Sequence, residues 1–479
     1  MKIAMFASES NPLAKSGGLA DVVYALSVEL AKKGNDVIVV LPFYRSIKKK
    51  QGIITKNIGS YTVTMSWRNQ KAMVYETTID GVRFYLIDNP YYFDRDNLYG
   101  YNDDGERFAF YALAAIELLK FISFQADIVH VHDWQSAMVP CLVKEGRKGD
   151  PFFQNTHFVL TIHNPAFKGM LDRYFLNDFF GLSDELFDNG AVRFQGMVST
   201  LKSGIIYSDK ITTVSPTHRE ELLTPLGSQG LSDVLRLREA DFAGFLNGID
   251  IKEWDTRKDP FLAKKYNAKS LEEGKHANQR DLLSSFRIHW YGGPVYGIVS
   301  RLSWQKGIDL VIESGRKALS NGANLVVLGS GEYGLEQKIE ALRRDFPDTC
   351  GVYIGYSNAL AHKIYAGSDF FLMPSLFEPC GISQMVAQRY GTLPIVRYTG
   401  GLVDTVDGYD GRETVGKNGI GFNDYNVEGL DYAIGLSRRL YSNQKEYYVV
   451  ARNAMALDRS WRKSAQNYLG MYKELVNRR

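Results

Sequence analysis

The sequence predicts an α/β protein with two similar halves, each built of alternating strands and helices. Short apolar segments of strand length alternate with longer segments whose apolar residues recur at helical spacing. The alternation begins at Lys2, gives way to a turn-rich stretch near residue 242, and begins again at Val295. The length of 479 residues suits two or three domains.

Composition narrows the function classes. The net charge of +3 gives no indication of nucleic-acid or membrane-surface binding. No apolar run approaches the roughly 18 residues of a membrane span, and Met1–Ala7 is interpreted as a strand, not a signal peptide. Cys141, Cys350 and Cys380 are widely spaced, which is typical of a reducing cytoplasm.

The first half is predicted to open with a strand–helix–strand unit. Its elements are a strand at Lys2–Ala7, a loop at Ser8–Gly18, a helix at Leu19–Lys33 ending at Gly34, and a strand at Asp36–Leu41. The loop contains Lys15-Ser16-Gly17-Gly18-Leu19. Adjacent glycines let the backbone approach a ligand closely, and Lys15 is a candidate counter-charge for phosphate.

The rest of this half continues the pattern. Strands are expected at Tyr61–Leu86 (three strands, with turns at Arg68–Gln70 and Asp80-Gly81), Asp127–Val131, His157–Ile162 and Lys210–Val214. Helices are expected at Arg107–Ile122, Gly190–Tyr207 and Pro216–Leu223. Tyr91–Gly105 is predicted to be irregular, Thr224–Leu237 to be turn-rich, and Phe242–Asp250 to connect the domains.

Polar residues follow two of these strands. Asp133 and Trp134 come after one strand, and His163 comes directly after another. Open α/β sheets bind ligands at the carboxyl ends of their strands, so we expect these side chains near a ligand. His130 and His132 share a strand face and could bind a metal, but no clear third and fourth ligand lies nearby.

The second half repeats the alternation of predicted strands and helices. Strands are expected at Val295–Val299, Asn324–Leu328, Val352–Ile354, Phe370–Met373 and Leu393–Arg397. Helices are expected at Ile308–Leu319, Asn358–Ala366, Met385–Arg389, Val427–Tyr441, Lys445–Ala456 and Trp461–Leu475. Arg301 and Lys306 lie in the turn after the first strand, and two cations there suit phosphate.

The turn Ser375–Gln384 is the most informative stretch. Glu378 is fixed by the following proline, Gly381 lets the backbone approach a ligand, and Ser383 is expected to cap a helix. The turn thus offers a carboxylate for hydroxyl groups and backbone donors for a phosphate. A nucleotide sugar carries both groups.

A dinucleotide oxidoreductase is a rival class, because Gly329–Gly334 has the form G-x-G-x-x-G. This motif follows the second strand of its half, and the next strand ends in Gly355-Tyr356 without an acidic residue for a ribose. Tyr356 is instead a candidate to stack on a base. The pattern Gly-Gly-Leu-x-Asp occurs at both Gly17–Asp21 and Gly400–Asp404, which fits two similar halves facing one cleft.

In combination, these motifs resemble glycosyltransferase family 5, the bacterial glycogen synthases and plant starch synthases. The matching motifs, in order, are Lys15–Leu19, Asp133-Trp134, His163-Asn164, Asn247–Asp250, Arg301 with Lys306, Glu378–Gly381 and Thr399–Leu402. The resemblance implies the GT-B fold, with two Rossmann-like domains facing a central cleft at 1–243 and 244–458. It also implies that a C-terminal helix, 459–479, crosses back to the first domain.

The implied reaction transfers glucose from ADP-glucose to the non-reducing 4-hydroxyl of an α-1,4-glucan, with retention at the anomeric carbon. Arg301 and Lys306 would hold the diphosphate, and Glu378 would bind the glucose 3- and 4-hydroxyls. His163 would lie beside the reacting sugar, close to Asp133.

The resemblance also implies two sets of binding residues. Those for nucleotide and phosphate are Lys15, Gly17, Gly18, Tyr356, Gly381 and Ser383. Those for sugar are Asn247, Glu378, Cys380 and Gly381. Ser16 replaces the Thr of many members, and Val386 stands where E-x7-E transferases have a second Glu, which favours the synthases.

We expect no cofactor and no metal. The D-x-D match Asp94-Arg95-Asp96 lies in the irregular loop, and Arg95 is expected to neutralise its neighbours. The expected partners are ADP-glucose and an α-1,4-glucan in the cytoplasm, with neither nucleic acid nor membrane; oligomeric state is unknown at this stage. A non-catalytic glucan-binding protein would predict loss of the phosphate cations, which are present. A phosphorylase would need a pyridoxal-phosphate lysine site that we do not find.

Overall fold

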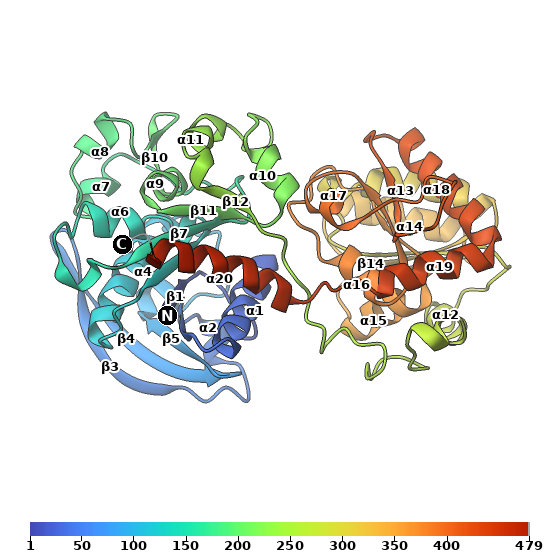
Figure 1. Cartoon of the computed structure of the whole chain (residues 1–479), viewed down its shortest axis with the longest axis horizontal. Coiled ribbons are helices and arrows are strands. Elements are labelled where there is room, and N and C mark those ends of the chain that lie inside the picture. Colours follow the sequence, from blue (N-terminus) through green and yellow to red (C-terminus); the bar gives the residue numbers. More distant parts are fainter. Residues whose placement is uncertain (478–479) are drawn as a thin grey trace. The chain divides into compact units, whose positions relative to one another are not determined.

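The computed structural model describes residues 1–477, which fold as two compact units (Figure 1). Unit 1 contains residues 1–247 and the C-terminal segment from Trp461, and unit 2 contains Gly248–Ser460. The sequence-based division lay after residue 243, with the chain returning from residue 459.

Unit 1 contains a nine-stranded sheet in the order β12-β11-β7-β6-β1-β2-β5-β4-β3. The strands are β1 (Lys2–Phe6), β2 (Asp36–Pro42), β3 (Lys56–Met65), β4 (Arg68–Ile79), β5 (Val82–Asp88), β6 (Ile128–His132), β7 (His157–Ile162), β11 (Lys210–Thr213) and β12 (Phe242–Gly244). All neighbours are parallel except the β5-β4-β3 meander. The central strands consist mostly of consecutive apolar residues because helices cover both of their faces.

Helices of unit 1 surround this sheet (Figure 1). They are α1 (Gly18–Lys32), α2 (Arg45–Lys48), α3 (Pro90–Phe93), α4 (Asp104–Phe121), α5 (Asp133–Ser136), α6 (Val139–Lys144), α7 (Phe175–Asp178), α8 (Glu185–Asp188), α9 (Thr200–Tyr207), α10 (Pro216–Leu222), α11 (Ser232–Leu237) and α20 (Trp461–Asn477). A small sheet joins β8 (Met170–Leu171), β10 (Met197–Ser199) and β9 (Arg193–Phe194). The last helix, α20, packs beside α1 and buries Trp461 and Tyr472, so the predicted return of the C-terminal helix to the first unit is confirmed.

Unit 2 contains a six-stranded parallel sheet in the order β15-β14-β13-β16-β17-β18. The strands are β13 (Val295–Val299), β14 (Asn324–Gly329), β15 (Cys350–Ile354), β16 (Phe370–Met373), β17 (Leu393–Arg397) and β18 (Ile420–Phe422). The helices are α12 (Leu271–Phe286), α13 (Ile308–Ser320), α14 (Tyr333–Asp345), α15 (Asn358–Gly367), α16 (Ser383–Arg389), α17 (Gly401–Thr405), α18 (Val427–Ser442) and α19 (Gln444–Met455). The predicted α/β class with two doubly wound units is confirmed.

Strand order locates the ligand edge of each unit. The order reverses between β13 and β16 in unit 2, and between β1 and β6 in unit 1. Loops that leave two such neighbouring strands in opposite directions open a crevice at the carboxyl edge, where doubly wound sheets bind ligands. The turns that contain Lys15, Asp133, Arg301 and Glu378 follow these four strands.

Several local predictions were wrong. The predicted helix at 190–207 is helical only in α9, because Gln195 (φ 49°) and Gly196 (φ 79°) turn the preceding residues into the β9–β10 hairpin. The predicted turn at 68–70 is the start of β4, since the chain already reverses at Ser66 (φ 56°). Further elements were not predicted as such, among them α12, α11 within the turn-rich stretch, and β12 within the supposed connection.

Candidate functional site

An ion pair lies at the crevice of unit 2. Lys306 follows β13, and its Nζ donates to Oε2 of Glu378, which follows β16, at 2.5 Å. The Ser375 hydroxyl donates to the same oxygen at 3.1 Å. Glu378 is only 7% exposed, so this carboxylate has two donors and little contact with solvent.

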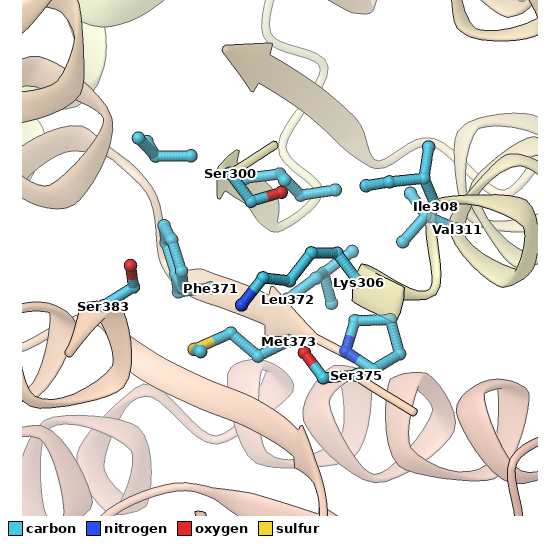
Figure 2. A pocket seen from close by; sticks show the side chains of 12 residues that line it. Ser300, Lys306, Ile308, Val311, Phe371, Leu372, Met373, Ser375 and Ser383 are labelled. Atoms are coloured by element: carbon cyan, nitrogen blue, oxygen red, sulfur yellow. The ribbon is translucent and has the colours of Figure 1, made fainter. Parts of the chain in front are cut away.

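A small cavity adjoins the ion pair, and the side chain of Lys306 extends into it (Figure 2). Ser300, Ser375 and Ser383 contribute the other polar groups, and apolar residues of β13 and β16 form much of the rest of the wall. Its volume of about 30 Å³ is room for about one water molecule. The cation therefore lies among hydroxyl groups at the crevice.

Two glycines allow the turns of unit 2 to pack against one another. Gly307 has φ 68°, and a Cβ there would lie 2.2 Å from the carbonyl oxygen of Pro374. Gly400 has φ 45°, and a Cβ there would lie 2.1 Å from the carbonyl oxygen of Glu378. Any larger residue would push the two turns apart, so these glycines fix where Lys306 and Glu378 meet.

The end of the Glu378 turn differs from the prediction in one respect. Ser383 does not cap α16; it is the first helical residue, and Ile382 occupies the cap position without a side-chain bond. Gln384 holds the turn instead, because its Nε2 donates to the carbonyl oxygens of Cys380 (3.1 Å) and Gly381 (3.2 Å). Ser383 keeps its hydroxyl at the cavity wall.

The other predicted nucleotide residues of unit 2 are exposed. The guanidinium of Arg301 has no hydrogen-bond partner within residues 1–477, so it is available to an anion. Tyr356 follows β15 and is 78% exposed, with its hydroxyl donating to Asn358 Oδ1 at 3.3 Å. Both lie on loops after strands of the same parallel edge.

In unit 1, Asp133 and His163 are brought together at the ends of β6 and β7. Oδ1 of Asp133 accepts the backbone N–H of His163 at 2.7 Å and that of Asn164 at 3.4 Å. Burial raises the pKa of Asp133 to about 7. Asp133 also has φ 54°, an unusual conformation for a residue with a Cβ. Such a conformation persists only where surrounding contacts hold it, and it is common at functional sites.

A chain of imidazoles runs beside Asp133. Nδ1 of His132 lies 3.1 Å from Nε2 of His163, and burial lowers the pKa of His163 to about 3. These rings are therefore neutral near pH 7, with one N–H donating to the other's lone pair. The side chain of Asn247 is also buried, and its Oδ1 has no hydrogen-bond partner in the described chain.

The glycine loop of unit 1 is held by a residue that sequence analysis missed. Glu9, which is 3% exposed, accepts the backbone N–H of Ser16, and burial raises the pKa of this carboxyl group. Lys15 is half-exposed and pairs with Asp21 at 2.8 Å. An acidic residue three positions after the end of β1 was the available signal for Glu9. Gly17 and Gly18 form the start of α1.

The residues considered for metal binding have other partners. The two ring nitrogens of His130 lie 2.6 Å from the hydroxyls of Tyr472 and Thr161. Arg45, not Arg95 as predicted, neutralises the D-x-D match, with contacts of 2.8 Å to Asp94 and 2.7 Å to Asp96. Within residues 1–477, no group of three or more His, Cys, Asp or Glu side chains is arranged to hold a metal.

The G-x-G-x-x-G motif has a packing role. A Cβ on Gly331 would lie 2.3 Å from the carbonyl oxygen of Leu302. The N–H of Gly331 donates to the side chain of Glu336 at 2.7 Å, so an internal carboxylate takes a donor that a pyrophosphate would need. These contacts weigh against the oxidoreductase alternative.

None of the helices within residues 1–477 has both the length and the apolar character that crossing a membrane requires.

Comparison with known proteins identifies the family. Residues 2–237 match the family described as starch synthase catalytic domain, and residues 289–454 match glycosyl transferases group 1. The glycogen synthase of Geobacillus thermodenitrificans is 43% identical over 479 residues, covering 100% of this chain and 98% of the relative. The glycogen synthase of Bacillus subtilis is 42% identical over 478 residues, covering 99% and 98%.

Solved structures give the same result. The catalytic domain of starch synthase IV from Arabidopsis thaliana, bound to ADP and acarbose, matches with a TM-score of 0.91 and 32% identity over 99% of both chains. A sucrose-phosphate synthase from Thermosynechococcus elongatus, at 16% identity, shares the fold with a TM-score of 0.62 over 99% of both chains. With full-length identity above 40% to glycogen synthases from several bacteria, the chain belongs to the glycogen synthase family.

Proposed function

We propose that this chain transfers glucose from ADP-glucose to the 4-hydroxyl at the non-reducing end of an α-1,4-glucan, with retention at the anomeric carbon. The Lys306–Glu378 pair is the observation that carries the proposal, because it places a phosphate cation beside a carboxylate for sugar hydroxyls. Family membership supports the reaction, and the starch synthase IV domain with bound ADP supports an adenine nucleotide.

The reaction breaks the bond between glucose C1 and the diphosphate oxygen. A new bond forms between C1 and O4 of the acceptor on the same face of the sugar, and the acceptor proton passes to a phosphate oxygen of the departing ADP. Negative charge grows on that phosphate as the bond breaks. Arg301 and Lys306 stabilise it, because fixed cations in a partly buried site need little reorganisation.

Glu378 orients the donor sugar. Its carboxylate can only accept hydrogen bonds when ionised, so it suits the 3- and 4-hydroxyls of glucose as donors. Binding of the diphosphate draws Lys306 away from Oε2 and frees that oxygen for the sugar. The backbone at Cys380 and Gly381 completes this contact, Ser383 binds a phosphate oxygen, and Tyr356 stacks on adenine.

Unit 1 supplies the remaining groups. Lys15 and the backbone of Gly17 and Gly18 assist at the phosphates. His163 lies beside the reacting sugar, with its carbonyl oxygen accepting the 6-hydroxyl; its imidazole is neutral, so it adds no charge there. Asp133 holds the backbone of His163 in place, and Asn247 offers the sugar a buried oxygen that still lacks a donor.

We further propose that no metal takes part and that the enzyme acts in the cytoplasm. Arg301, Lys306 and Lys15 offer the positive charge that a divalent metal would otherwise supply to a diphosphate. All three cysteines are buried, which suits a reducing compartment. We propose neither a nucleic-acid partner nor a membrane partner.

Incorporation of labelled glucose into glycogen, measured separately with ADP-glucose and UDP-glucose, tests the function and the donor. We expect faster incorporation from ADP-glucose. Equal or faster rates with UDP-glucose would overturn the donor assignment, and no incorporation from either would overturn the function. The Lys306→Met variant, purified identically, controls for contaminating synthase from the expression host.

A further inference from the structure

The two stretches of chain that join unit 2 to unit 1 are paired with each other. Residues 248–250 lead into unit 2 and residues 458–460 lead out of it. Ile249 and Ser460 form a parallel bridge, and the N–H of Ile249 donates to the carbonyl oxygen of Arg459 at 2.8 Å. This connection therefore has a defined structure where it meets unit 2.

The side chain of Arg459 extends from this connection into unit 2. Its Nη2 donates to the carbonyl oxygen of Thr405 at 2.6 Å, and its Nε donates to Oε1 of Gln388 at 3.3 Å. Gln388 in turn donates to the same Thr405 oxygen at 2.9 Å. Thr405 is the last residue of α17, so two side-chain donors, from Arg459 and Gln388, meet at the end of that helix.

The opposite end of α17 touches the sugar-binding turn. Gly401, its first residue, donates its N–H to the carbonyl oxygen of Glu378 at 3.2 Å. The hydroxyl of Thr405 donates to the carbonyl oxygen of Gly401 at 2.6 Å and accepts from Nε2 of Gln384 at 3.0 Å. The same Nε2 holds the carbonyl oxygens of Cys380 and Gly381.

We propose that Arg459 is a positioning residue for glucosyl transfer, acting through Thr405 and Gln384 on the turn Glu378–Gly381. Thr405 and Gln384 are buried, at 1% and 0% exposure, so their bonds are shielded from water. The turn contains Gly381 at φ 71°, and three of its backbone carbonyl groups, those of Glu378, Cys380 and Gly381, are bonded by Gly401 and Gln384. The network therefore helps to fix the backbone from which the Glu378 carboxylate extends.

The inference deepens the proposed function and rests on it. Any change in the paired connection at Ile249 and Ser460 is transmitted by Arg459 to the group that binds the donor sugar. Arg301 and Lys306 lie on the loop after β13, and the hydrogen bonds of Arg459, Thr405 and Gln384 do not reach that loop; it meets the turn at the Lys306–Glu378 ion pair. We therefore expect loss of Arg459 to affect sugar placement more than nucleotide binding.

The first test compares Arg459→Met, which keeps length but removes both hydrogen bonds, with Arg459→Lys, which can restore one. Misplacement of a reacting group by about 1 Å can cost about 10²-fold in rate, so we expect kcat to fall about 10- to 100-fold in Arg459→Met. We expect partial recovery in Arg459→Lys, and the Kd for ADP within about twofold of wild type in both.

Arg452→Met is the matched control. Arg452 lies on α19 of the same unit and donates to the carbonyl oxygen of Ala268 at 3.2 Å, without a bond to the network. We expect its kcat to be unchanged. A change of less than twofold in Arg459→Met, or a rise in the Kd for ADP as large as the loss of kcat, would overturn the proposal.

A double-mutant cycle provides the second test and uses Thr405→Val, which keeps shape and removes the hydroxyl. If Arg459 acts through Thr405, the double variant Arg459→Met/Thr405→Val should have a kcat only slightly below that of the more impaired single variant. Losses that multiply would show independent effects and overturn the path. Failure of the proposed function is distinguishable, since wild type itself would then transfer no glucose.

Discussion

Substituting Lys306 and Glu378 separately and then together distinguishes the catalytic role of the ion pair from its structural role. Three variants are needed: Lys306→Met, Glu378→Gln, and the double variant. The two side chains are 19% and 9% exposed, so the pair is mostly buried. In Lys306→Met, the Glu378 carboxylate keeps only the Ser375 hydroxyl as a side-chain donor.

The expected loss of stability is unequal. Removing one partner of a buried pair costs up to about 3–5 kcal/mol in the free energy of unfolding, and Lys306→Met should approach that range. Glu378→Gln should cost less, because the flexible ammonium of Lys306 can turn toward water. The double variant should regain most of the loss, since no unpaired charge remains.

The expected loss of activity follows a different pattern. Each single variant should lose about 10²–10³ in kcat, or about 2.7–4 kcal/mol, which is typical of a lost donor in a preorganised site. The double variant should stay as inactive as the singles. Urea unfolding and initial rates of glucose transfer measure the two quantities. A double variant that regained both stability and activity would refute the catalytic roles.

Three further predictions concern metal independence and pH. Activity in excess EDTA should match the untreated enzyme; loss that Mg²⁺ or Mn²⁺ restores would turn attention to Asp94 and Asp96. Because Asp133 holds its proton to about pH 7 when folded and ionises near pH 3.8 when unfolded, the free energy of unfolding should fall as pH rises between these values. Asp133→Asn should therefore gain stability over wild type from pH 5 to pH 8 in urea titrations, and a constant difference would contradict the assignment. Burial lowers the pKa of His130 to about 3, so wild type should lose stability as pH falls below about 6.5. His130→Gln should show a shallower loss in acid unfolding, and an unchanged slope would exclude His130 as a cause.

The ligand edge of each unit was predictable because strand-to-helix turns leave local signals. Apolar runs marked the strands before Arg301, Glu378 and His163, and the polar residue after each run marked the carboxyl edge. These signals depend on residues a few positions apart, so a single sequence contains them.

Contacts between distant residues were not predictable in this way. Glu9 bonds across the loop to Ser16, and Arg459 reaches Thr405, 54 positions earlier in the chain. The β9–β10 hairpin was missed because its apolar spacing also fits a helix, and only left-handed backbone at Gln195 and Gly196 distinguishes the two. Similarly, Arg95 was predicted to neutralise Asp94 and Asp96 because it stands between them in the sequence, whereas folding brings Arg45 to both aspartates.

The most direct test of the central claim is a nuclear magnetic resonance analysis of the products from ADP-glucose and maltotriose. We expect maltotetraose with a new α-1,4 linkage at its non-reducing end, and one ADP released for each glucose transferred. A β-linked product would contradict retention. Release of ADP with free glucose, and no longer glucan, would contradict the assignment of a glucan acceptor.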